Sequence, residues 1–174
     1  MLWRHLKSIL ILPGNALVVM PGLLLWFTRE TTYGFTLAHP GQPRFWAALV
    51  FAAGGLTLMT ATIRLFARQG EGTLAPWDPT QKLVVDGPYR HVRNPMISGV
   101  LSVVAAEALF FQSWPVTAWL VFFYVMNSIY FRVHEEKGLE ARFGDDYRVY
   151  KKNVPRWIPR TTPWASENYF NNMP

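Results

Sequence analysis

The chain has 174 residues, of which 51% are hydrophobic and 16% aromatic, and its formal net charge is +6. This length fits one domain, and the composition excludes an ordinary soluble fold and indicates a small integral membrane protein. The absence of cysteine excludes disulfides, thiolate metal sites and a cysteine nucleophile.

Four apolar runs predict about four transmembrane helices. They cover roughly residues 9–27, 45–66, 96–111 and 115–131. The first two runs approach the ~20 residues that a helix needs to cross a bilayer. The third would be only about 24 Å long as a helix, and the last two are expected to form a tight hairpin. The predicted fold is therefore an all-α integral membrane protein with a C-terminal hairpin that continues into a cytoplasmic helix.

The basic residues predict the orientation of these spans. If the four runs cross the membrane in turn, 15 of the 17 Lys and Arg residues lie on one side of it, and only Arg29 and Arg44 lie on the other. The positive-inside rule then places both termini in the cytoplasm and explains the net charge without a nucleic-acid partner. We expect the chain to reside in a bacterial inner membrane.

The segment between the second and third runs is rich in Gly, Pro and Asp. Residues 82–85 are a short extended candidate, and Asp86-Gly87 is a turn dipeptide. Asn94-Pro95 predicts a helix start, with Asn as the capping acceptor and Pro in the first turn. The N–H groups of that helix start, together with Arg90 and Arg93, would attract a carboxylate or phosphate. Snorkelling to lipid headgroups is the alternative explanation of the two arginines.

A second polar block follows the fourth run. The helix is expected to continue to Gly144, with Glu135 and Glu136 on its cytoplasmic part. One of these acids would pair with Arg132, and the other would bind a cation, an amine or ribose hydroxyls. A short helix would follow and end before Pro155.

Two segments resemble a family of membrane methyltransferases that includes isoprenylcysteine carboxyl methyltransferase and phospholipid N-methyltransferase. They are TLAPWDPTQKLVVDGPYRHVRNPMISG and, beyond the hairpin, EEKGLEARFGDDYRVYKKNVPRWIP. The resemblance implies S-adenosylmethionine as cofactor and a lipophilic acceptor from the bilayer. The cofactor-binding residues that it implies, together with their neighbours in the same two motifs, are Tyr89, Arg90, Arg93, Asn94, Pro95, Met96, Gly99, Glu135, Glu136, Leu139, Tyr147 and Tyr150. Two positions depart from the family pattern: Asn94 stands where the carboxyl methyltransferases usually have His, and Ile97 where Tyr is frequent.

The chemistry of the acceptor determines the catalytic residues expected. Glu135 or Glu136 would serve as a base for an amine acceptor, whereas Arg156 would orient an anionic one. No metal is expected, because the histidines lack ligand spacing. No G-x-G-x-x-G motif follows a strand, which excludes the soluble Rossmann design. An NADPH-dependent enzyme that resembles steroid reductases and a non-catalytic membrane interaction protein remain the alternatives.

These predictions divide the chain into three regions. Residues 1–66 would form the N-terminal spans, residues 67–160 the catalytic and cofactor-binding region, and residues 161–174 a flexible or surface-lying tail. Membrane lipids and a lipophilic substrate are the expected partners, and no oligomeric state is predicted.

Overall fold

The computed structural model describes residues 13–69 and 83–165, and every regular element in these two ranges is helical. The elements are the π-helical turn η1 (Asn15–Val19), α2 (Met20–Thr28), α3 (Pro43–Gln69), the 3-10 turn η2 (Gly87–Arg90), α4 (Pro95–Phe111), α5 (Trp114–Tyr130), the π-helical turn η3 (Phe131–Glu135) and α6 (Glu136–Asn153). Residues 83–85, part of the extended candidate, form no strand. The all-helical class is thus confirmed for the described residues.

Two helices are long and apolar enough to cross a membrane. They are Pro43–Leu65 in α3 and the helical stretch Trp114–Asn153, which comprises α5, η3 and α6 and has a kink at Gly144. The most apolar windows of these helices are only 22% and 11% buried within the protein, so most of their apolar surface faces outward. A bilayer accounts for such outward apolar faces. The helices Asn15–Thr28 and Pro95–Phe111 are apolar but shorter, so within residues 13–69 and 83–165 two of the four expected spans meet the length of a full crossing. The first expected run starts before the described residues.

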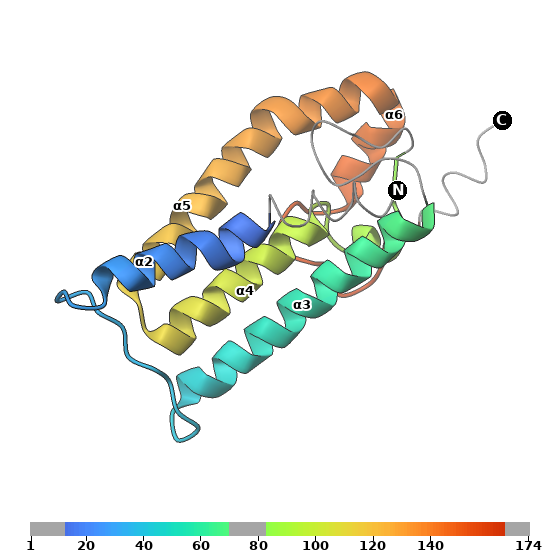
Figure 1. Ribbon diagram of the computed structural model, residues 1–174. Coiled ribbons are helices and arrows are strands. Elements are labelled where there is room, and N and C mark those ends of the chain that lie inside the picture. Colours follow the sequence, from blue (N-terminus) through green and yellow to red (C-terminus); the bar gives the residue numbers. More distant parts are fainter. Residues whose placement is uncertain (1–12, 70–82, 166–174) are drawn as a thin grey trace.

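The helices α3 and α4 pack at very short range. A Cβ atom built on Gly99 would lie 2.6 Å from Cγ of Met59 and 2.9 Å from the carbonyl oxygen of Gly55, and a Cβ atom on Gly55 would lie 2.6 Å from the carbonyl oxygen of Gly99. Small residues at a crossing allow two membrane helices to approach closely. This crossing fixes the start of α4 against α3 (Figure 1).

A two-residue turn joins α4 to α5 as a tight hairpin, as the sequence predicts. Gln112 adopts a left-handed conformation with φ 47°, and the Ser113 side chain caps α5 by accepting a hydrogen bond from the Val116 N–H. The loop between α2 and α3 covers this end, because the N–H groups of Thr36 and Ala38 donate to the last carbonyl groups of α4. Those carbonyl groups have no partner within the helix.

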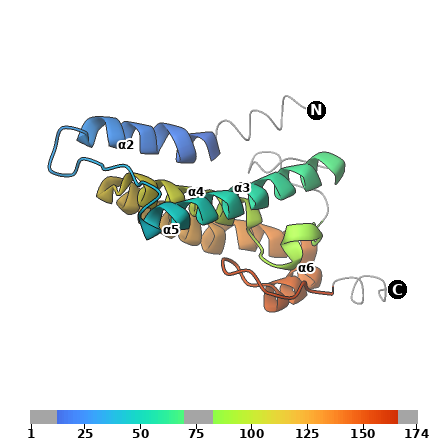
Figure 2. The same ribbon diagram turned by 90° about the horizontal axis from the view of Figure 1, so that it is seen from below.

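The hydrophobic core lies around α4. It consists of Ala16, Met59, Met96, Val100, Val104, Ala108 and Val116, which come from the four apolar helices. Figure 2 shows α2 on one side of α3, α4 and α5, and the segment after α6 on the other side. The start of α4 and the end of α5 lie at the same end of this bundle, and the candidate site forms there.

Helix α6 turns back towards the start of α4 at the glycine that the sequence analysis selected. Gly144 has φ 52° and ψ −126°, a conformation that breaks the helix and that side chains rarely adopt. The part after Gly144 ends at Asn153, immediately before Val154 and Pro155, as predicted. This turn brings the second half of α6 beside the first (Figure 1).

Candidate functional site

The loop before α4 is held by backbone hydrogen bonds to the segment after α6. The Arg93 N–H donates to the Pro155 carbonyl, the Arg160 N–H to the His91 carbonyl and the Trp164 N–H to the Arg90 carbonyl, all at 2.9–3.0 Å. Between these contacts Val92 is completely buried. Two polar blocks that lie far apart in the sequence thus pack together as one unit.

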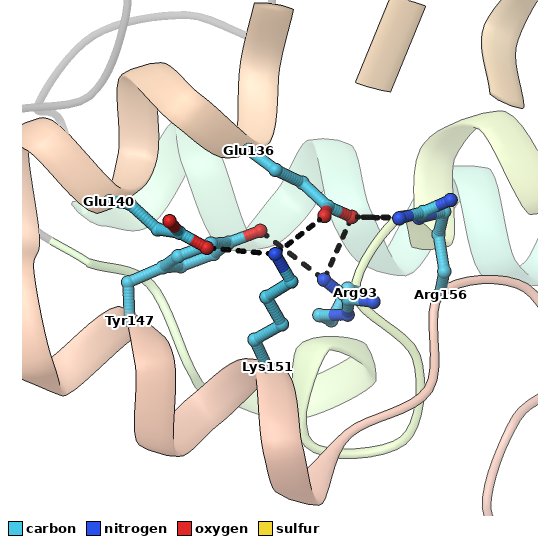
Figure 3. Close-up of polar contacts among 6 residues, drawn as sticks. All are labelled: Arg93, Glu136, Glu140, Tyr147, Lys151 and Arg156. Carbon is cyan, nitrogen blue, oxygen red and sulfur yellow. Dashed lines mark hydrogen bonds and ion pairs between the residues drawn. The ribbon is translucent and has the colours of Figure 1, made fainter. Parts of the chain in front are cut away.

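The Glu136 carboxylate is the centre of an ion cluster in this unit (Figure 3). Its Oε1 atom accepts from Arg93 at 2.9 Å and from the Arg156 Nε at 2.7 Å, and its Oε2 atom lies 3.1 Å from the Lys151 ammonium. The exposed fractions are 6% for the Glu136 side chain, 10% for Arg93 and 16% for Arg156. The cluster therefore links the start of α4, both parts of α6 and the following segment within a largely buried environment.

Lys151 and Glu140 complete the cluster, and sequence reasoning missed both. The Lys151 ammonium donates to Glu140 Oε1 at 2.8 Å while it contacts Glu136. These partners are 11 and 15 residues away in the chain, so no helical spacing suggests them. They meet because Gly144 turns α6 back on itself. The sequence suggested a local ion pair between one of the two acids and Arg132. In the described part of the chain, Glu136 pairs with Arg93, Lys151 and Arg156 instead, and Arg132 is exposed.

Three cations around one carboxylate determine the protonation of Glu136. Burial alone would raise the pKa of this carboxyl group, but the hydrogen bonds from Lys151 and Arg156 and the charge of Arg93 outweigh it. The pKa of Glu136 therefore lies below its usual value of 4.5. A carboxylate whose charged form is so well stabilised is a poor proton acceptor near neutral pH.

Glu135 has a different environment from its neighbour. Burial raises the pKa of the Glu135 carboxyl to about 7; the charge of Arg142 lowers it and that of Glu136 raises it. No hydrogen bond from another described side chain to Glu135 is present. A partly buried carboxylate with a pKa near neutrality is suited to accept a proton.

Three tyrosines, Tyr89, Tyr147 and Tyr150, lie beside the ion cluster. The Arg93 guanidinium donates to the Tyr147 hydroxyl at 3.3 Å, and the Tyr150 hydroxyl donates to the Tyr89 carbonyl at 2.8 Å. Tyr147 and Tyr150 are buried with Val85 and Val154, and Leu139 and Trp164 pack against them. Burial raises the pKa of all three tyrosines, first among the causes, so their hydroxyls stay protonated near neutral pH.

Three polar atoms at this end of the hairpin are buried without a hydrogen-bond partner. They are Arg93 Nε, Ser98 Oγ and Ser128 Oγ, and the only other such side-chain atom among residues 13–65 and 83–165 is Glu107 Oε2. Buried polar groups normally have a partner, so these atoms are candidates for contact with a ligand or water. The unpaired Arg93 donor, beside the N-terminus of α4, fits a ligand carboxylate.

The start of α4 lies at the predicted residue, but the predicted side-chain cap is absent. The helix begins at Pro95 as predicted, and the Asn94 carbonyl accepts from the Ser98 N–H. The prediction that the Asn94 side chain caps this helix is wrong, because that side chain makes no capping hydrogen bond. Asn94 has φ −121° and ψ 62°, a conformation outside the extended region that a capping residue usually adopts.

The other predicted site residues separate into two groups. Tyr89, Arg90 and Leu139 lie in or beside the unit formed by the loop and α6, where Arg90 also donates to the Trp164 carbonyl at 2.7 Å. Met96 and Gly99 lie in the packing between α3 and α4 instead, and Pro95 is buried at its edge. The structure therefore brings Arg93, Glu136, Tyr147 and Arg156 into direct contact and places Gly99 in the helix crossing.

Comparisons with known proteins match the region that builds this site. A family model described as phospholipid methyltransferase matches residues 43–146, which is more than half of the chain. A stretch of 44 residues is 46% identical to an uncharacterized protein of Haemophilus influenzae and covers 24% of this chain and 68% of that protein. The family match includes α3, α4, α5 and the Glu135-Glu136 pair, and it ends before Lys151 and Arg156.

Proposed function

The chain belongs to the phospholipid methyltransferase family, and from this premise we propose that it methylates a lipophilic acceptor with S-adenosylmethionine as cofactor. The observation that supports this proposal best is the buried donor set at the start of α4. There the unpaired Arg93 Nε and the helix N-terminus offer one anion site at the end of the membrane hairpin. One carboxylate fits this site better than the several phosphates of a dinucleotide.

The residues of the cluster have distinct proposed roles. Arg93, with the N–H groups of Met96 and Ile97 in the first turn of α4, would hold the carboxylate of the cofactor. Glu136 would position Arg93 and Arg156 through its ion pairs, and Tyr89, Leu139, Tyr147 and Tyr150 would form the wall behind them. When bound, S-adenosylmethionine supplies an activated methyl group on its sulfonium. We propose residues 67–160 as the region that carries this chemistry.

The two acids favour an amine as acceptor. A protonated amine must lose a proton before it can accept a methyl group, and Glu135 is the carboxyl group whose pKa of about 7 suits this role. Arg156, the residue that would orient an anionic acceptor, is engaged by Glu136. We therefore propose a phospholipid amine as acceptor and a prenylated carboxylate as the second candidate.

Ligand-induced stabilisation tests the cofactor. We expect S-adenosylmethionine and its demethylated product to raise the unfolding temperature of the purified protein in detergent, because a ligand at 100 times its dissociation constant stabilises by about 2.7 kcal/mol. NADPH should have no such effect. Arg93→Gln is the matched variant and should lose the response. Stabilisation by NADPH alone would indicate a reductase, and no response to any ligand would indicate a non-catalytic membrane protein.

Methyl transfer to defined lipids tests the acceptor. The protein is reconstituted in vesicles that contain phosphatidylethanolamine and supplied with S-adenosylmethionine labelled on its methyl group. Labelled phosphatidylethanolamine would support the amine. Labelling of a prenylated cysteine analogue in place of phosphatidylethanolamine would reject the amine and assign Arg156 to the anionic acceptor.

A further inference from the structure

The segment after α6 runs alongside the membrane helix α5. The Trp157 ring lies 5.6 Å from the ring of Tyr124 in α5 and 5.6 Å from the ring of Phe131. Tyr124 precedes Phe131 by seven residues, which corresponds to about 10 Å along a helix axis. Trp157 therefore lies beside the last turns of α5. It contacts the apolar part of that helix.

The opposite side of the same segment faces α3 at a similar depth. Pro159 and Pro163 line an open groove of about 700 Å³ together with Gly54, Thr57, Leu58 and Ala61 of α3. Gly54 lies 11 residues before Leu65, the end of the candidate span, or about 16 Å along the helix. Two helices thus independently place residues 157–163 alongside membrane-spanning segments.

The tip of this segment is apolar and exposed. Ile158 has 80% of its surface exposed, which is the largest fraction among the exposed large hydrophobic residues of the described chain. Through Trp157 and Tyr124 it adjoins the outward face of α5, where Val121, Val125 and Ile129 are 57%, 44% and 54% exposed. The apolar surface of the membrane helix therefore continues onto this loop.

Several polar groups near the tip are directed towards the protein or are missing. Pro155, Pro159 and Pro163 have no N–H group, and the Arg160 N–H donates to the His91 carbonyl. Arg156 turns inward to Glu136, and the Arg160 guanidinium donates to the Asn153 carbonyl at 2.7 Å, so the nearest charges point away from the tip.

We propose that Trp157 and Ile158 form a membrane anchor that inserts into the leaflet on the side of the Glu136 cluster. The partner is the lipid bilayer itself, contacted at the boundary between headgroups and acyl chains, where Trp is favoured. Because Arg156 precedes Trp157 directly, the anchor ties the position of the Arg156 guanidinium to the membrane surface. This inference does not depend on methyl transfer.

A fluorescent probe at the tip tests the anchor, and the absence of native cysteine makes single-site labelling straightforward. Ile158→Cys is labelled with an environment-sensitive fluorophore and reconstituted in phosphatidylcholine vesicles with or without bromine atoms on the acyl chains. Brominated lipid should quench this probe as strongly as a probe on Val125→Cys in α5. A probe on Lys152→Cys, which is exposed on α6, should keep its fluorescence in both vesicles.

A second measurement on the same samples keeps the outcome clear. Circular dichroism verifies that each labelled variant keeps its helix content, and a water-soluble quencher should reach the Lys152 probe but not the Ile158 probe. If the Ile158 probe behaves like the Lys152 probe in both quenching experiments, the loop lies in water and the anchor is refuted. Quenching by neither reagent would mean that protein covers Ile158, which also refutes it.

Discussion

Glu135 and Glu136 are neighbours in the sequence, but they contact different parts of the site. Glu136 is surrounded by two arginines and a lysine, whereas Glu135 has no hydrogen bond from another described side chain. The first arrangement stabilises a permanent negative charge, and the second allows protonation near neutral pH. The two neighbouring carboxyl groups therefore differ in the protonation state that their surroundings favour.

We predict that Glu136→Gln mainly destabilises the fold. The substitution leaves Arg93 and Arg156 largely buried without a counter-charge, and loss of one partner of a buried pair costs about 3 kcal/mol. Thermal unfolding in detergent measures this effect. The depressed pKa of Glu136 also means that its contribution is present above the ordinary value of 4.5 and is lost as the pH falls. The acid-dependent loss of stability should shrink in the variant, and equal stability of both proteins would contradict the cluster.

We predict that Glu135→Gln keeps the fold and loses turnover of an amine acceptor. The unfolding temperature should remain close to that of the wild type, because no described side chain hydrogen-bonds to Glu135. In the wild type, a base with a pKa of about 7 must lose its proton to act, so kcat/KM should rise with pH through about 7. The variant should lack this rise. A pH profile that is the same in both proteins would assign the base elsewhere.

The sequence motifs predicted the residues of the ion cluster only in part. The Arg93 and Glu136 positions follow from the two polar blocks and from the resemblance, because the two blocks flank the apolar hairpin in the sequence. The contact of Lys151 with Glu136 did not follow, since it requires the exact turn that Gly144 makes. The Asn94 cap was wrong because capping depends on backbone angles that the residue type does not determine.

At the scale of elements, proline and glycine residues predicted the helix boundaries well. Pro95 begins α4, Pro115 lies in the first turn of α5, and Gly144 breaks α6 with a positive φ. These signals act through local backbone geometry, so they can be recognised in one sequence. The crossing of α3 and α4 at Gly55 and Gly99 joins distant segments, and the pattern of residues along either helix alone does not reveal it.

We predict that Gly99→Ala destabilises this crossing. Its new Cβ atom would meet Cγ of Met59 at 2.6 Å and the Gly55 carbonyl oxygen at 2.9 Å, and overpacking typically costs about 1–3 kcal/mol. Gly54→Ala is the matched control on α3, because nothing lies within 4 Å of its Cβ position. The control should be neutral or slightly stabilising, since Ala favours helix over Gly. Equal unfolding temperatures of the two variants would disprove the close crossing.

At the scale of the whole molecule, the helices place the ion cluster and the α4–α5 turn at opposite ends of the bundle (Figure 1). The cluster end includes Arg93, Lys151 and Arg156, whereas Arg44 lies at the turn end and donates to Gln112. For these four residues, the folded chain agrees with the charge distribution along the sequence. The positive-inside rule then predicts that the cluster lies on the cytoplasmic side.

We predict that the two ends label from opposite sides of the membrane. Ser113 is a poor labelling site for the turn end, because it is 1% exposed and caps α5. Thr32, in the loop between α2 and α3, is exposed and represents that end, and Lys152 represents the cluster end.

A membrane-impermeant maleimide should react with Thr32→Cys in intact spheroplasts and with Lys152→Cys only in inverted vesicles. The reason is that 15 of the 17 basic residues favour the cytoplasm at the cluster end. The cysteine-free wild type controls for background labelling. Reaction of both variants from one side would show that the connecting helices do not cross the bilayer as proposed, and a reversed pattern would place the cluster outside the cytoplasm.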